Sequence, residues 1–127
     1  MQEFSQVEAN TLNYMRDVVY QNNVEVGWYT DPKTGLKRER NIPEMLMLIV
    51  SEVAEAMEGY RKDLMDDHLP HRSQIEAELA DVFIRLCDLA GYLNLDFGGA
   101  VVEKHAYNMN RVDHKLKNRI ETNGKKF

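Results

Sequence analysis

The chain has 127 residues, of which 43% are hydrophobic and 29% are charged, and its formal net charge is −5. This composition predicts one soluble globular domain over residues 1–127, and the negative charge argues against nucleic acid as a partner. No apolar run is long enough to cross a membrane, and the first five residues lack the basic start and apolar centre of a secretory signal. With Cys87 as the single cysteine, a reducing, cytoplasmic location is expected.

Long helices are expected because the chain has only three prolines and seven glycines and shows no sustained strand alternation. Apolar residues recur three and four positions apart in four segments, which predicts an all-α, four-helix bundle-like fold. Residues 118–127 are polar and interrupted by Gly124, so they are expected to form a flexible tail. The predicted helices cover residues 4–23, 42–62, 74–93 and 97 to at least 116.

Three of these helices carry recognisable start signals. Two consecutive glycines, Gly98 and Gly99, follow the start of the last helix and would let another backbone approach closely. The second helix is expected to start at Asn41, with Pro43 in its first turn. The third starts at Ser73, which forms a capping box with Glu76, and the last starts at Asp96.

A loop is predicted over residues 27–41, because Asp31-Pro32 and Thr34-Gly35 are turn signals. It holds the only tryptophan, Trp28, next to Tyr29 and near four cations. Aromatic rings beside cations would suit a nucleobase stacked on a ring with its phosphates nearby. Trp28 and Tyr29 are therefore candidate base-binding residues, and the alternative is that Trp28 closes one end of the bundle. The cations are Lys33, Lys37, Arg38 and Arg40.

Two pairs of acids lie in the second and third predicted helices, Glu52 with Glu55 and Glu78 with Asp81. The spacing of three residues places each pair on one face of its helix. Two antiparallel helices joined by a short loop would aim all four carboxylates at one point. Acids that converge away from water need a cation to neutralise them. This predicts a Mg²⁺ site, which Mn²⁺ could also fill, with these four residues as ligands.

The second helix is apolar nearly all the way round. The most continuous stripe of apolar residues on this helix is expected to pack in the core. Further apolar residues flank the acids, so the acids are expected to lie in a covered cleft. A helix that needs cover on two sides predicts a homodimer. The expected core stripes are Leu46, Ile49, Val50, Val53 and Met57 on the second helix and Leu79, Val82, Phe83, Leu86 and Ala90 on the third, where Glu78, Asp81, Arg85, Asp88 and Tyr92 form the opposite, polar face.

The motif Glu52-x-x-Glu55, followed after twenty-two residues by Glu78-x-x-Asp81, resembles the signature of the MazG-like all-α nucleoside triphosphate pyrophosphohydrolases. Hydrophobic residues flanking both motifs strengthen the likeness, which covers about residues 28–111. The resemblance implies Mg²⁺-dependent hydrolysis of an NTP or dNTP to the monophosphate and pyrophosphate, with the four acids as metal ligands and catalytic residues. It also implies assembly as a homodimer or a dimer of dimers. Of the four acids, Glu55 is the candidate general base.

Lys104, Asn108 and Arg111 follow one another at i, i+4 and i+7 and would line one face of the last helix. Two cations and an amide in one row could clamp phosphates, and a solvated face fits the same spacing equally well. The MazG-like family has a similar line after its acid motif, so the resemblance favours phosphate binding.

Three alternatives share parts of this pattern. A di-iron carboxylate bundle would need Glu-x-x-His pairs, which both acid pairs lack. A phosphoribosyl-nucleotide pyrophosphohydrolase of the same superfamily would use the same acids. A non-enzymatic helical dimerisation module would leave the acids facing water, without a saturable metal site.

Overall fold

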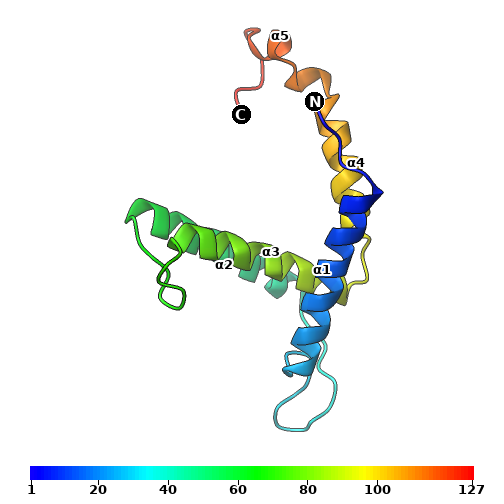
Figure 1. Ribbon diagram of the computed structural model, residues 1–127, viewed down its shortest axis with the longest axis vertical. Helices are drawn as coiled ribbons and strands as arrows, with labels where there is room; N and C mark the ends of the chain where they lie inside the picture. The colour runs from blue at the N-terminus through cyan, green and yellow to red at the C-terminus, as the bar shows by residue number, and fades with distance from the viewer. The chain divides into compact units, whose positions relative to one another are not determined.

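The computed structural model describes all of residues 1–127 and is entirely helical, without β-strands (Figure 1). The all-α prediction is confirmed. The chain forms two compact units, one of residues 15–95 and one that joins residues 1–14 to residues 96–127. None of the helices is both long and apolar enough to cross a membrane. The helices are α1 (Gln6–Glu25), α2 (Ile42–Arg61), α3 (Gln74–Tyr92), α4 (Phe97–Met109) and α5 (Leu116–Arg119), with a 3₁₀ turn at Val112–His114.

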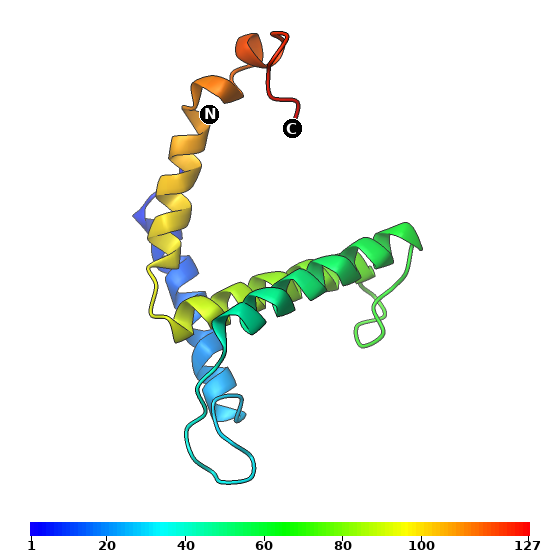
Figure 2. The same ribbon diagram turned by 180° about the vertical axis from the view of Figure 1, so that it is seen from behind.

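In the larger unit, α2 and α3 run side by side in opposite directions (Figures 1 and 2). The predicted start signals are confirmed. The side chain of Asn41 accepts a hydrogen bond from the N–H of Glu44 at 2.9 Å, and Pro43 occupies the first turn. Ser73 and Glu76 form the capping box of α3. Because both helix starts are fixed by local hydrogen bonds, the register of the acids along each helix is fixed as well.

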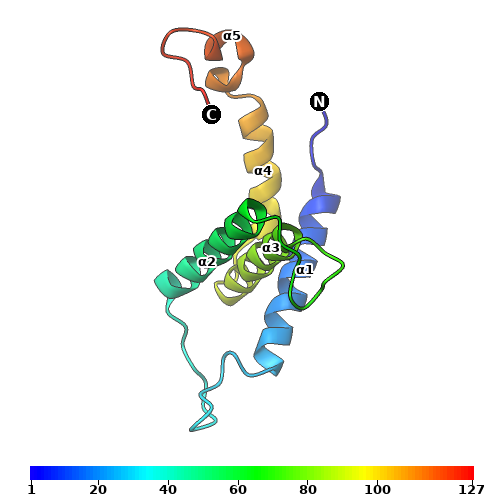
Figure 3. The same cartoon turned by 90° about the vertical axis from the view of Figure 1, so that its left-hand side faces the viewer.

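Residues 27–41 form a loop between α1 and α2, as the turn signals predict (Figure 3). It folds back on itself through an isolated backbone pairing of Thr30 with Lys37. The second half of α1 packs against the end of α3, where a Cβ added to Gly91 would collide with the side chain of Tyr20. This close approach explains why a glycine stands inside α3.

In the smaller unit, the first turn of α4 lies against the start of α1. A Cβ on Gly98 would collide with the carbonyl of Ala9, and the N–H of Gly98 donates to the side chain of Asn13 at 2.7 Å. The predicted close approach of another backbone at this glycine is confirmed. The ring of Phe4 also lies against the ring of His105, with ring centroids 4.7 Å apart and the two planes tilted by 43°.

The last helix is shorter than predicted. It ends at Met109, and Arg111 has an extended backbone with φ −67° and ψ 131°. The side chain of Asn110 donates to the carbonyl of Ala106, and such local bonds compete with continued helix. The predicted single row is therefore wrong in one respect: Lys104 and Asn108 lie on α4, and Arg111 lies beyond its end.

The predicted core stripe of α2 is wrong at four of its five residues, and the fifth, Ile49, is half-buried. The buried residues of α2 are small or polar, apart from one methionine. A Cβ at Gly59 would collide with Gln74 at the start of α3. On α3 the predicted stripe fails at Leu79, which is 53% exposed. The buried residues of α2 are Met45, Glu52, Ala56 and Gly59, whereas Leu46, Val50, Val53 and Met57 are 49%, 52%, 49% and 57% exposed.

Candidate metal centre and adjoining pocket

Three carboxylates from α2 and α3 converge. Each of Glu52, Glu55 and Glu78 offers one oxygen, and these oxygens all lie within 4.8 Å of one another. Glu52 and Glu78 are only 8% and 9% exposed, whereas Glu55 is open to solvent. The convergence that the i, i+3 spacing predicts is therefore present for three of the four acids, at a distance that a single small cation could bridge.

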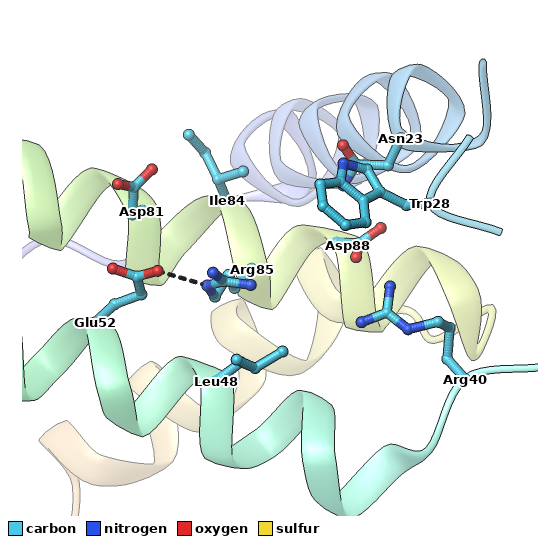
Figure 4. A pocket seen from close by; sticks show the side chains of 9 residues that line it. All are labelled: Asn23, Trp28, Arg40, Leu48, Glu52, Asp81, Ile84, Arg85 and Asp88. Carbon is cyan, nitrogen blue, oxygen red and sulfur yellow. Dashed lines mark hydrogen bonds and ion pairs between the residues drawn. The ribbon is translucent and has the colours of Figure 1, made fainter. Parts of the chain in front are cut away.

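Within this cluster, Glu52 forms an ion pair with a cation of the chain. The Nε of Arg85 on α3 donates to Oε1 of Glu52 at 2.8 Å (Figure 4). Burial of Glu52 opposes its ionisation, but the hydrogen bond from Arg85 and the other neighbouring groups outweigh burial and hold the pKa of Glu52 below its usual value. Glu52 is therefore ready to act as a charged ligand at neutral pH.

Glu78 has the opposite electrostatic setting. Burial comes first among the causes, followed by the neighbouring carboxylates of Glu52, Glu55 and Asp81, and together they raise the pKa of Glu78 to about 7. Its Oε2 is buried and has no hydrogen-bond partner. A buried carboxylate oxygen without a partner is costly, and a bound cation would satisfy it. The donor set consists only of hard carboxylate oxygens, which suits Mg²⁺ or Mn²⁺.

Asp81, the fourth predicted ligand, does not belong to the group of three oxygens. It lies beside Glu52 at the wall of the adjoining pocket (Figure 4). Burial, and then the charge of Glu52, raises the pKa of Asp81, although Arg85 acts in the other direction. Its position next to the cluster keeps it available to a second ion or to a ligand in the pocket.

The pocket has a volume of about 420 Å³, which is within the usual range for small-molecule sites. Its two ends differ in chemistry (Figure 4). Glu52 and Asp81 line one end with Arg85 between the ends, and an aromatic ring lines the other. The pocket is lined by Asn23, Trp28, Arg40, Leu48, Glu52, Asp81, Ile84, Arg85 and Asp88.

The two aromatic residues of the loop are placed differently. Trp28 is 59% exposed and lines the pocket, so it does not close the end of a bundle within this chain. Tyr29 is only 5% exposed, and its ring lies against Tyr20 and Tyr92, with centroids 5.1 Å away in each case. Of the two candidate base-binding residues, Trp28 alone presents its ring to the pocket.

Several residues of the pocket were not singled out from the sequence as parts of a site. Arg85 and Asp88 follow Asp81 on α3 at positions that fall on the same face, so their helical spacing was a usable signal. Asn23 lies near the end of α1, and no local pattern connects it to α3. Arg40 is the member of the four predicted loop cations that lines the pocket. Their place in the pocket follows from the path of the loop.

The predicted phosphate-binding residues belong to the other compact unit. The Nζ of Lys104 lies 5.0 Å from the ring centroid of Tyr107. Arg111 pairs with Asp113 at 2.6 Å, and this pairing raises the pKa of Arg111. Phosphate binding by Lys104, Asn108 and Arg111 stays a prediction.

The chain was also compared with known proteins. No family model matches it, and neither the curated proteins nor the solved structures contain a match. The chemistry of the site therefore has to be inferred from the residues themselves.

Proposed function

We propose that this protein is a Mg²⁺-dependent nucleoside triphosphate pyrophosphohydrolase, which converts an NTP or dNTP into the monophosphate and pyrophosphate. The observation that carries the proposal is the meeting of Glu52, Glu55 and Glu78 beside a pocket that also holds an exposed tryptophan. An acid cluster next to an aromatic surface suits a ligand with phosphates at one end and a base at the other.

The three glutamates would hold the ion, with Asp81 as a further ligand at the pocket wall. When bound, Mg²⁺ would offset the negative charge of the phosphate chain and favour release of the pyrophosphate. The unpartnered Oε2 of Glu78 supports this fit, because a carboxylate oxygen buried without a hydrogen bond lacks the partner that a metal would supply.

The other charged groups have roles that follow from their positions. Glu55 is the exposed acid of the cluster and can accept the proton of an attacking water. The water oxygen would bond to the α-phosphorus as the bond to the leaving pyrophosphate breaks. The guanidinium groups of Arg40 and Arg85 line the pocket and would bind phosphate oxygens. The choice of the α-phosphorus rests on the resemblance to the MazG-like group, as does the role of Lys104, Asn108 and Arg111 in phosphate binding.

The active form is a homodimer or a pair of dimers. This is supported by the exposed stripe of α2, defined here as Leu46, Val50, Val53 and Met57. Its spacing of four, three and four residues is typical of a helix that pairs with another helix. About half of each side chain is exposed, so a second copy could bury a continuous apolar seam without disturbing the α2–α3 contact.

A pyrophosphate-release assay tests the enzyme proposal. The full chain is incubated with Mg²⁺ and each ribo- and deoxynucleoside triphosphate, with a phosphoribosyl-nucleotide in the same panel to separate the two related activities. Replacement of Glu52 or Asp81 by Ala should abolish release, and Glu103→Ala, an exposed change on α4, should not. Unchanged turnover in Glu52→Ala or Asp81→Ala would refute the assignment.

A further inference from the structure

Asp88 is a buried acid that the proposed hydrolysis does not use. It lies on α3, is 9% exposed and lines the pocket at the end that holds Trp28 (Figure 4). Its Oδ1 accepts a hydrogen bond from the hydroxyl of Tyr29 at 2.8 Å. Its other oxygen, Oδ2, has no hydrogen bond within the chain and is not among the fully enclosed polar atoms. One acceptor oxygen of a largely desolvated carboxylate is therefore left for a ligand.

The position of this carboxylate is fixed by the packing of Tyr29. The tyrosine ring is enclosed by Tyr20 and Tyr92, and the guanidinium of Arg40 lies over it at 5.6 Å from the ring centroid. Because Tyr29 is held on several sides, its hydroxyl holds Oδ1 of Asp88 in one place. The remaining oxygen then has a defined direction of approach, which is the requirement for selective recognition.

We propose that the end of the pocket formed by Trp28 and Asp88 binds a nucleobase with an exocyclic amino group, stacked on Trp28, with its amino N–H donating to Asp88. The inference rests on the proposed function, because it takes the other end of the pocket as the site for the phosphates. It adds the substrate class: nucleotides of adenine, cytosine or guanine in preference to those of uracil or thymine.

The chemistry of a carboxylate accounts for this preference. An ionised aspartate only accepts hydrogen bonds. Cytosine and adenine carry an amino donor where uracil and thymine, or hypoxanthine, carry a carbonyl oxygen. A carbonyl facing Asp88 would place two acceptors against each other and leave the buried carboxylate unpaired. Sites built around a hydrogen bond reject analogues that lack the matching group much more strongly than apolar pockets reject an added methyl.

Matched nucleotide pairs test the proposal in the full chain. Binding of the α,β-methylene analogues of CTP and UTP, and of ATP and ITP, is measured in Mg²⁺ by calorimetry, and quenching of Trp28, the only tryptophan, reports stacking. The amino-bearing member of each pair should bind about 10-fold to 100-fold more tightly, which is the range for a hydrogen bond to a charged group. Asp88→Asn should abolish or invert both preferences, because its oxygen still accepts from Tyr29 and its amide NH2 then faces the base, where it donates to a carbonyl oxygen but not to an amino group. Asp67→Asn, a change in the exposed α2–α3 loop, should leave the ratios as they are.

The outcomes separate this inference from the enzyme proposal. Selective binding without pyrophosphate release would support the role of Asp88 and refute the hydrolase. Release of pyrophosphate at equal rates and equal affinities from all bases would leave the hydrolase standing and overturn the role of Asp88. Ratios that Asp88→Asn does not change would also overturn it, as would failure of every nucleotide to bind.

Discussion

Arg85 and Glu52 form an ion pair across the α2–α3 contact, with Nε of the arginine 2.8 Å from Oε1 of the glutamate. Glu52 is the least exposed of the clustered acids. The arginine therefore neutralises one of the three clustered carboxylates. Glu55 and Glu78 form no ion pair with a lysine or arginine of the chain. A divalent ion would complete this neutralisation, which is why the pair marks the centre of the site.

Replacing Arg85 by Met should destabilise the metal-free protein by about 1–2 kcal/mol, after allowance for solvent around the exposed part of the arginine. The loss arises because Glu52 stays buried without its partner. Urea unfolding without metal measures it. Saturating Mg²⁺ should stabilise Arg85→Met more than the wild type, and Arg85→Met combined with Glu52→Gln should recover stability. Equal stability of wild type and Arg85→Met without metal would contradict the role of the pair.

Glu78→Gln should raise the stability of the metal-free protein at pH 8 while removing metal binding. The raised pKa of Glu78 means that the folded state favours its protonated form. Its contribution is fully present below the ordinary value of 4.5 and is lost as pH rises to about 7. At about 1.4 kcal/mol for each pKa unit, the loss is on the order of 3 kcal/mol before screening by solvent reduces it. Metal-free wild type should therefore become less stable from pH 4.5 to 7 relative to Glu78→Gln, by urea unfolding at each pH. A difference that stays constant with pH would show that Glu78 does not titrate in this range.

Tyr29→Phe should cost about 1–2 kcal/mol at pH 7, because Asp88 loses a hydrogen bond in a buried place. Burial, and then the hydrogen bond to Asp88, raises the pKa of Tyr29 above its usual 10. The stability that this group contributes is present below pH 10 and is lost as pH rises further. Tyr29→Phe should therefore lose less stability above pH 10 than the wild type. Tyr60→Phe, at a position 74% exposed, is the control and should follow the wild type at every pH.

Val53→Glu should convert the homo-oligomer into a smaller assembly. Val53 lies in the middle of the exposed stripe of α2, where a charge would be buried against a second copy. Light scattering at micromolar concentration should give about twice or four times the chain mass of 14.8 kDa for the wild type and a smaller assembly for Val53→Glu. Val7→Glu, at an exposed position of α1, should keep the mass of the wild type. A monomeric wild type would count against the homodimer.

What the sequence predicts well is local. The starts of α2 and α3 follow from Asn41 and from the Ser73–Glu76 box, since these residues bond to backbone within one turn. The convergence of Glu52 and Glu78 follows from those starts, because helix geometry then fixes the register.

Contacts between distant parts of the chain were not predictable in the same way. The pairing of Asp88 with Tyr29 spans 59 residues and depends on the path of the α1–α2 loop. Apolar residues cover most of α2, so their periodicity does not identify the side of the helix that meets α3. Small residues at Ala56 and Gly59 decided that contact, and the apolar stripe was left exposed. The early end of α4 coincides with a hydrogen bond from the side chain of Asn110 to the carbonyl of Ala106, which the spacing of apolar residues does not predict.

The most direct test of a metal site between α2 and α3 is calorimetric titration of the metal-free full chain with Mn²⁺ and with Mg²⁺. The wild type should bind both ions saturably, Glu52→Gln and Glu78→Gln should lose the saturable heat, and Glu103→Gln should keep it. Absence of saturable binding in the wild type, or identical binding in Glu78→Gln, would contradict the metal centre and the hydrolase proposed from it.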